Sequence, residues 1–194
     1  KNQSGEAGID DDVTIYSPEQ VGNTEKYWQA ISTKGYATYG LVGRGSDPIV
    51  LKAGSLWGWG NNNGGRLGDG TIPNKSSPVQ TSDLTSTWVS VSAGQEHGGG
   101  IKENGTLWMW GRNLNGQLGD FELTPQGQVN PQQTIIEGNT WSQISCGDYH
   151  TAAIQSDRSL WVWGYNSFGQ LGNGYQGDVF TPEKLDETYD WKFV

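Results

Sequence analysis

The sequence predicts an all-β fold, a β-propeller of four-stranded antiparallel blades, from three observations. A tryptophan-rich phrase recurs as LWGWG, LWMWG and LWVWG at residues 56–60, 107–111 and 160–164. Its copies lie 51 and 53 residues apart, which is the period of a propeller blade. The chain is also rich in turn and aromatic residues, with 30 Gly and 10 Trp among 194 residues. A solenoid is the alternative, although solenoid coils are usually shorter.

Each repeat unit is expected to open with two strands joined by a turn. The first strand has the form WVSVS and occurs at residues 28–32, 88–92, 141–145 and, truncated, 191–194. The second strand has the form HTAAI at residues 97–101 and 150–154, and the degenerate form ATYGL at residues 37–41. Between the second and third strands, Asn104–Gly105 is the strongest two-residue signal for a hairpin.

The third strand is the LW-x-WG phrase, and the fourth strand carries a proline. Alternation along the third strand places the leucine and the tryptophans on opposite faces. Gly60, Gly111 and Gly164 end this strand, where a side chain would obstruct the bending of the backbone. Proline has no N–H to donate, so the fourth strand is expected at the edge of each blade. Its prolines are Pro18, Pro78, Pro131 and Pro182.

The repeat period also predicts the organisation of the chain. We expect a linker or extension at residues 1–16 and a partial β-propeller at residues 17–194. Its units cover about residues 28–87, 88–140 and 141–190, and a further blade starts at residues 191–194. The first unit is longer than the others by nine residues, which we place at residues 42–50.

The number of units is small for a propeller. About three and a half blades are present, whereas closed propellers have about 4–8. The chain also begins with Lys1 rather than Met. We therefore expect residues 1–194 to be one portion of a longer chain. Three adjacent aspartates at residues 10–12 lack the ligand spacing and the turn glycine of a calcium loop, so we expect them to be solvated.

The pattern W-x-x-I/V-S-x-G-x-x-H-T, followed by LW-x-WG-x-N-x-x-GQLG-x-G, resembles the regulator of chromosome condensation repeat family. The match is best at residues 141–174, and good at residues 88–119, where GGG replaces the usual Thr-x-Ala. It is weakest in the first unit, where Ala37 replaces the histidine. The resemblance covers roughly residues 17–194 and implies a propeller, normally of seven blades, built by the repeat residues. Those structural residues are Trp57, Trp59, Gly60, Trp108, Trp110, Gly111, Trp161, Trp163, Gly164, His97 and His150.

Charge and motif content argue against several functions. The net charge is −9, from 21 acidic and 12 basic residues without a basic stripe, so we expect no nucleic-acid partner. No apolar run approaches the ~20 residues of a membrane-spanning helix. No nucleophile elbow, phosphate loop or metal-binding histidine motif occurs, so we expect no enzyme, no cofactor and no metal. Cys146 is the only cysteine and is expected to be a small packed residue.

The remaining expectation is a non-catalytic module for protein–protein interaction or structure. Its partners would be proteins, including the remainder of its own propeller or other assembly subunits. The polar, lysine-poor composition favours a virion or cell-surface component of phage or bacterial origin. The resemblance implies two alternatives, a guanine-nucleotide exchange factor for a small GTPase and a secreted inhibitor-type binding propeller. Candidate partner-binding residues lie in the divergent loops, where a rigid scaffold commonly carries function: Arg44, Asp47, Phe121, Glu122 and Tyr175.

Overall fold

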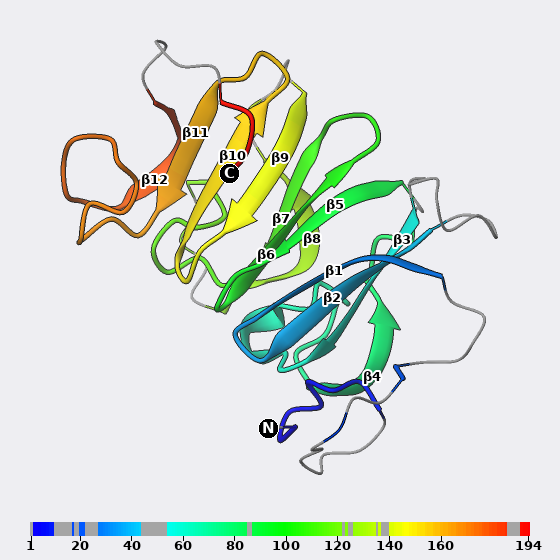
Figure 1. The fold of residues 1–194 in the computed structure, drawn as a ribbon. Coiled ribbons are helices and arrows are strands. Elements are labelled where there is room, and N and C mark those ends of the chain that lie inside the picture. The colour runs from blue at the N-terminus through cyan, green and yellow to red at the C-terminus, as the bar shows by residue number, and fades with distance from the viewer. Residues whose placement is uncertain are drawn as a thin grey trace.

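The regular secondary structure of the protein, in a computed structural model, consists almost entirely of antiparallel β-strands (Figure 1). The structure describes residues 2–9, 17, 20–21, 27–43, 54–84, 87–121, 123, 126–134, 136, 140–185 and 191–194. Within these residues the strands form three consecutive four-stranded blades, and a single bridge between Gly54 and Trp88 joins the first two blades into one sheet. The prediction of an all-β, partial β-propeller is therefore confirmed. The described residues include no helix that is long and apolar enough to cross a membrane.

Each blade is formed by four strands that pair in chain order. The first blade consists of β1 (Trp28–Lys34), β2 (Ala37–Gly43), β3 (Gly54–Gly60) and β4 (Lys75–Gln80). The second consists of β5 (Trp88–Ala93), β6 (His97–Lys102), β7 (Leu107–Gly111) and β8 (Gln128–Gln133). The third consists of β9 (Trp141–Cys146), β10 (His150–Gln155), β11 (Leu160–Gly164) and β12 (Val179–Lys184). A 3-10 turn, η1 (Asn63–Gly65), follows β3.

The first strand of each blade is innermost and the proline strand is outermost. β1 packs against β5, and β5 packs against β9. Serine hydroxyls link these strands. Ser32 Oγ accepts a hydrogen bond from Ala93 N, and Ser92 Oγ accepts one from Cys146 N, both at 2.9 Å. β4, β8 and β12 each pair with the third strand of their own blade. This is the edge position that suits a residue without an N–H.

The hydrophobic core lies between neighbouring blades. Tyr39, Leu56 and Leu67 of the first blade pack with Trp88 and Trp110 of the second. The second and third blades pack in the same way, through Leu107, Met109, Leu118, Trp141 and Trp163. Each blade therefore presents its aliphatic face to the next blade and its tryptophan face to the preceding one.

Residues 2–9, which belong to the stretch expected to be a linker or extension, pack on the first blade. They are a further copy of the loop that follows the third strand, because Asn2, Gly5 and Gly8 repeat an Asn-x-x-Gly-x-x-Gly spacing that is also found at residues 62–68. Asn2 is fully buried, and its Oδ1 accepts Ala7 N at 2.7 Å. The carbonyl oxygen of Glu6 accepts Trp59 Nε1 at 3.1 Å, which fixes this segment on the first blade. Residues 10–16 lie outside the described residues.

The additional residues of the first unit lie between β2 and β3. These strands remain paired as far as Gly43 and Gly54, so strand structure continues past residue 42, where we placed the start of the insertion. The matching hairpin of the second blade closes tightly, with Gly105 at φ 79° and its N–H bonded to Lys102 O at 2.8 Å. Arg44 and Asp47 lie outside the described residues, and their partner-binding role stays a prediction.

Candidate functional site on the loop face

Two connections of each blade lie at the same end of that blade. Because the strands alternate in direction, the turn between the first two strands lies beside the loop between the last two. We call this end the loop face; it lies toward the left of Figure 1. It comprises the described parts of turns 35–36, 94–96 and 147–149 and of loops 61–74, 112–127 and 165–178.

Backbone hydrogen bonds hold each turn to its loop. Asn61 N donates to Tyr36 O at 2.8 Å in the first blade. Arg112 N donates to Glu96 O at 3.0 Å, and Tyr165 N donates to Tyr149 O at 2.8 Å. The same bond therefore joins the turn to the loop within each of the three blades.

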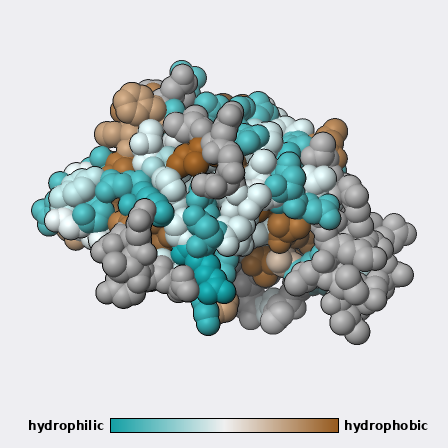
Figure 2. Space-filling model, turned by 90° about the horizontal axis from the view of Figure 1, so that it is seen from above, coloured by the Kyte–Doolittle hydropathy of each residue, from teal (hydrophilic) through white to brown (hydrophobic). Residues whose placement is uncertain are grey.

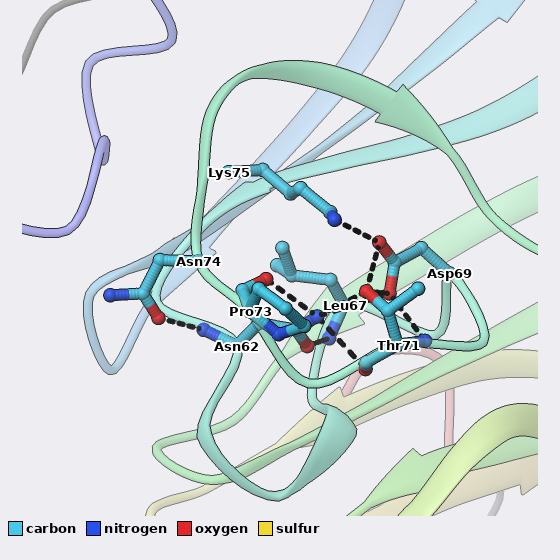
Figure 3. Close-up of polar contacts among 7 residues, drawn as sticks. All are labelled: Asn62, Leu67, Asp69, Thr71, Pro73, Asn74 and Lys75. Carbon is cyan, nitrogen blue, oxygen red and sulfur yellow. Dashed lines mark hydrogen bonds and ion pairs between the residues drawn. The ribbon is translucent and has the colours of Figure 1, made fainter.

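A buried asparagine organises the loop of the first blade (Figure 3). Asn62 is fully buried, and its Oδ1 accepts Leu67 N at 2.9 Å. Its Nδ2 donates to Asp69 Oδ1 at 3.0 Å and to the carbonyl oxygens of Thr71 and Pro73 at 3.0 and 3.2 Å. One side chain thus satisfies backbone groups on both sides of the loop, which is how asparagine replaces regular structure in turns.

The other two loops repeat this arrangement. Asn113 Oδ1 accepts Leu118 N at 2.9 Å, and its Nδ2 donates to Asp120 Oδ1 at 2.6 Å. Asn166 Oδ1 accepts Leu171 N at 3.0 Å. Both asparagines are fully buried. A buried asparagine therefore organises the described part of each of the three loops.

The second tryptophan of each LW-x-WG phrase binds the loop of the preceding blade. Trp110 Nε1 donates to Arg66 O at 2.8 Å, and Trp163 Nε1 donates to Gln117 O at 2.9 Å. Both tryptophans are fully buried. The first tryptophan of each phrase is half-buried, and its Nε1 donates to the hydroxyl group two residues earlier, on Ser55, Thr106 or Ser159. The residues in this group are Trp57, Trp108 and Trp161.

The glycine that ends each third strand has a left-handed backbone. Gly60, Gly111 and Gly164 have φ values of 101°, 98° and 100°. A Cβ atom on Gly111 would lie 2.7 Å from Glu96 O, and one on Gly164 would lie 2.6 Å from Tyr149 O. Only glycine permits both this conformation and the close approach of the turn.

The two histidines, His97 and His150, are the first residues of β6 and β10, next to the turns of the loop face. His97 is fully buried, and its Nε2 lies 3.0 Å from Thr151 Oγ1, which donates to Gln117 O at 2.9 Å. The Thr151 hydroxyl has one proton, and it is used in the bond to Gln117 O. The hydroxyl oxygen therefore accepts a hydrogen bond from His97, and His97 Nε2 is the donor. Burial, followed by the charges of His150, Lys34 and Arg66, lowers the pKa of His97 to about 3. No three His, Cys, Asp or Glu side chains gather as a metal site among the described residues.

We expect acid to destabilise the fold through His97. Its folded pKa lies below the ordinary value of about 6.5, so the unfolded chain takes up the proton first. The contribution of neutral His97 to the free energy of unfolding is complete above pH 6.5 and is lost as the pH falls toward 3. Between pH 6.5 and pH 4.5 the unfolding free energy of the wild type should fall by about 2 kcal/mol relative to His97→Gln.

Urea denaturation at several pH values measures this difference. His150→Gln is the matched control, because His150 is only half-buried, although burial lowers its pKa too. If the wild type and His97→Gln lost the same unfolding free energy on acidification, the acid sensitivity could not be attributed to His97.

Charged side chains fix the inner turns of the loop face. Arg66 is 5% exposed, and its Nη1 donates to the carbonyl oxygens of Gly35 and Gln95 at 2.7 and 2.6 Å. Burial lowers the pKa of Arg66, while the charge of Glu96 raises it. Glu96 lies between two guanidinium groups, 3.8 Å from Arg66 and 3.7 Å from Arg112. These contacts tie the turns of the first two blades together.

Large hydrophobic side chains project from the loop face. Each of seven such residues is at least 47% exposed: Tyr36, Ile72, Leu114, Phe121, Leu123, Phe168 and Tyr175. Figure 2 shows hydrophobic patches interrupting a largely hydrophilic surface. Exposed aromatic residues on rigid loops are typical of interaction sites.

The third blade carries the densest aromatic group. The Tyr149 and Tyr165 rings pack edge to face with centroids 6.4 Å apart, and the Tyr165 and Phe168 rings lie 6.1 Å apart. Phe168 is 82% exposed. The sequence prediction did not include these residues. The sequence contains one signal for Phe168: it is an aromatic residue at a loop position where the other two repeats have Gly64 and Asn115.

Two of the predicted partner-binding residues lie on the loop face. Phe121 is 73% exposed and Tyr175 is 50% exposed, with its hydroxyl 2.6 Å from Glu183 Oε2. The structure does not place them in the aromatic group of Phe168. Glu122 lies outside the described residues.

Phe121 has a left-handed backbone that favours glycine. Its φ is 64°, and the corresponding residues of the other loops are Gly70 and Gly174, with φ values of 81° and 88°. Because the side chain is mostly exposed, Phe121→Gly should raise the unfolding free energy by about 0.5–1 kcal/mol. Chemical denaturation measures the change. Phe168→Gly, where φ is not positive, is the control and should not stabilise the chain; equal effects of both changes would contradict the explanation.

The fold and the loop face define a β-propeller that presents rigid loops from tandem blades. The chain belongs to the regulator of chromosome condensation (RCC1) repeat family, whose family model matches residues 53–100, 104–154 and 157–194. A second model of the same repeat matches residues 88–117 and 141–170.

Relatives support this assignment, and solved structures share the fold. The chain is 30% identical to the ultraviolet-B receptor UVR8 of Arabidopsis thaliana, over all of this chain and 42% of that protein. It is 32% identical to the mitochondrial RCC1 domain-containing protein RUG3 of the same plant, over 75% of this chain and 34% of that protein. Human WBSCR16 matches with a TM-score of 0.81 at 21% identity, over 97% of this chain and 48% of that chain. The chain spans less than half the length of these proteins.

Prp20p from Saccharomyces cerevisiae has the same fold. It matches with a TM-score of 0.70 at 17% identity, over 84% of this chain and 39% of that chain. The structure of Prp20p is described together with its binding to Gsp1p and histones, and another structure shows it bound to Kap60.

Proposed function

We propose that this chain is a non-catalytic interaction module whose loop face binds a protein partner. The observation that carries the proposal is the row of exposed hydrophobic side chains on asparagine-organised loops. Phe168, 82% exposed beside Tyr165, has the chemistry of an interface anchor. A rigid loop lowers the entropy lost on binding, because the loop is already ordered in the free protein.

Charge favours a protein partner over a nucleic acid. The net charge is −9, and Arg66 and Arg112 of the loop face, with Lys34 beside it, lie near acidic side chains. Arg66 and Arg112 lie near Glu96, and Lys34 Nζ lies 3.0 Å from Asp148 Oδ1. A nucleic-acid surface would need cations that are free to neutralise phosphates.

Affinity capture with two matched variants tests the proposal. Phe168→Ser removes the exposed anchor of the loop face, and Leu84→Ser removes a 71% exposed side chain from the linker between β4 and β5, at the opposite end of the blades. Wild type and both variants would be incubated with an extract of the organism that carries the gene, and captured proteins would be quantified by mass spectrometry.

We expect at least one protein to be captured by the wild type and Leu84→Ser and to fall about tenfold or more with Phe168→Ser. Thermal melting of the three proteins controls for folding. Capture of the same proteins in the same amounts by Phe168→Ser would reject the loop face as the binding surface.

Guanine-nucleotide exchange stays an alternative prediction. A likeness to Prp20p at 17% identity carries the fold alone, and a nucleotide-release assay with small GTPases tests this activity. The secreted inhibitor-type propeller and the virion or cell-surface setting also stay predictions.

A further inference from the structure

The chain contains several Asn-Gly pairs, and the contacts of their asparagines differ. An Asn-Gly pair can lose the side-chain amide as ammonia, because glycine has no Cβ to hinder attack by its backbone nitrogen on the preceding side chain. In a folded protein the rate depends on the groups that surround the amide. The pairs are Asn63–Gly64, Asn104–Gly105, Asn115–Gly116 and Asn173–Gly174.

The Asn63–Gly64 pair lies in the loop of the first blade, under an arginine from the loop of the second blade. Asn63 is exposed, and its Oδ1 accepts a hydrogen bond from Arg112 Nη2 at 2.8 Å. The stem of Arg112 lies directly on Gly64, where a Cβ atom would be 2.4 Å from Arg112 Cγ and 2.8 Å from Arg112 Nε. Glu96 lies 3.7 Å from Arg112 Nη1. The cation is therefore held beside both residues of the pair.

A cation in this place favours each charged stage of ammonia loss. The nucleophile is the Gly64 nitrogen after it loses its proton, and a positive charge nearby stabilises that anion. Arg112 Nε, which lies against Gly64, is buried and has no hydrogen-bond partner among the described residues, so its N–H is available to the anion.

The same guanidinium stabilises the oxygen of the amide. Attack on Cγ of Asn63 turns Oδ1 into an oxyanion, and Arg112 Nη2 already donates to this atom. The bond strengthens as the oxygen becomes charged. A donor that is in place before the reaction lowers the barrier, because it does not have to be reorganised.

The Asn104–Gly105 pair, in the turn between β6 and β7, has no such cation on its amide. Asn104 Oδ1 accepts bonds from the neutral N–H and hydroxyl of Thr106, at 3.1 and 2.7 Å. The Gly105 N–H, which would have to become the nucleophile, donates to Lys102 O at 2.8 Å. Asn104 is exposed like Asn63, so exposure does not distinguish the two pairs.

The amides of the other two pairs lie beside carboxylates. Asn115 Nδ2 donates to Asp178 Oδ2 at 3.1 Å, and Asn173 Nδ2 donates to Glu183 Oε2 at 3.4 Å. A negative charge beside the amide disfavours both the anionic nucleophile and the oxyanion. Of the four pairs, Asn63–Gly64 therefore has the surroundings that suit the reaction.

We propose that Asn63 is a site of spontaneous deamidation directed by Arg112. The Gly64 nitrogen gives its proton to hydroxide and bonds to Cγ of Asn63. The Cγ–Nδ2 bond then breaks, and Nδ2 takes a proton from water and leaves as ammonia, so a succinimide ring remains. Water opens this ring at either carbonyl carbon and produces aspartate or isoaspartate at position 63.

The modification adds one negative charge to the loop face. The new carboxylate takes the place of the amide that Arg112 contacts, so a hydrogen bond to a neutral group becomes an ion pair. It competes with Glu96, which also lies 3.8 Å from Arg66. Because the reaction is not reversed by water, the altered form accumulates with the age of the molecule.

Peptide mapping by mass spectrometry tests this proposal on the full chain. Purified protein is incubated in mildly alkaline buffer, and the deamidated fraction of each Asn-Gly pair is followed over time. Arg112→Met removes the cation and keeps an unbranched stem over Gly64. Lys34→Met is the matched control, because it removes a cation that pairs with Asp148 instead. Asn104 is the reference pair within the same molecule.

We expect Asn63 to be deamidated about tenfold faster than Asn104 in the wild type and in Lys34→Met, and Arg112→Met to lower this ratio to about one. Circular-dichroism melts establish that the variants fold. The wild type unfolded in urea should also give a ratio of about one, because it no longer holds Arg112 on Gly64, and this comparison needs no variant. A ratio near one in the folded wild type would overturn the proposal. So would a ratio that either urea or a folded Arg112→Met leaves unchanged.

Discussion

Replacement of Asn62 by alanine is expected to lower the free energy of unfolding by about 3 kcal/mol. The side chain is fully buried and bonds both the N–H of Leu67 and the carbonyl oxygens of Thr71 and Pro73. Alanine leaves those groups buried without a partner, and each such group costs about 1–3 kcal/mol. Differential scanning calorimetry should show a melting temperature roughly 10 °C lower.

The neighbouring residue provides the control for this experiment. Asn63 is exposed, and its Oδ1 accepts one bond from Arg112 Nη2, at 2.8 Å. Asn63→Ala should change the unfolding free energy by about 0.5 kcal/mol or less. Equal losses in Asn62→Ala and Asn63→Ala would show that burial of the asparagine does not organise the loop.

Replacement of Gly98 by threonine is expected to destabilise the second blade by about 3 kcal/mol. Threonine occupies the same repeat position in the other blades, where Thr151 Oγ1 donates to Gln117 O at 2.9 Å. At Gly98, the Tyr39 hydroxyl takes the place of that hydroxyl and donates to Arg66 O. A Cβ atom on Gly98 would lie 2.5 Å from Tyr39 Oη and 2.7 Å from Trp110 Nε1. The core is close-packed there, so neither ring can move away cheaply.

A double-mutant cycle distinguishes this clash from a general intolerance of side chains at Gly98. Tyr39→Ala alone should cost about 4 kcal/mol, because it leaves a cavity. In Tyr39→Ala with Gly98→Thr, the threonine has room and can donate to Arg66 O. The double variant should therefore be more stable than the sum of the single changes predicts, by at least about 1 kcal/mol. Additive losses in urea denaturation would contradict the exchange of roles between Tyr39 and Gly98.

The blade architecture could be predicted because its signals are local and periodic. The LW-x-WG phrase identifies β3, β7 and β11, and Pro78, Pro131 and Pro182 identify the outermost strands. Each signal lies within one strand, so no knowledge of packing between blades was required.

The features that were missed depend on contacts between distant residues. Residues 2–9 form a repeat loop, but no LW-x-WG phrase precedes them to mark it. Gly98 is explained by Tyr39, on the neighbouring blade, and no local pattern joins the two. Exposure separates Phe168 from the buried aromatic residues, and exposure depends on which face of a blade is covered. Local sequence therefore predicts the scaffold better than the exposed side chains of the loop face.

The bond from each second tryptophan to the preceding loop also has a consequence for the order of synthesis. The loop carbonyl of Arg66 receives its donor from Trp110, 44 residues later, and that of Gln117 receives its donor from Trp163, 46 residues later. At about 5–20 residues per second, each loop is complete only roughly two to nine seconds after it leaves the ribosome. Each of these two loops thus matures one blade behind the growing chain, and the loop face is completed in sequence as the ribosome extends the chain.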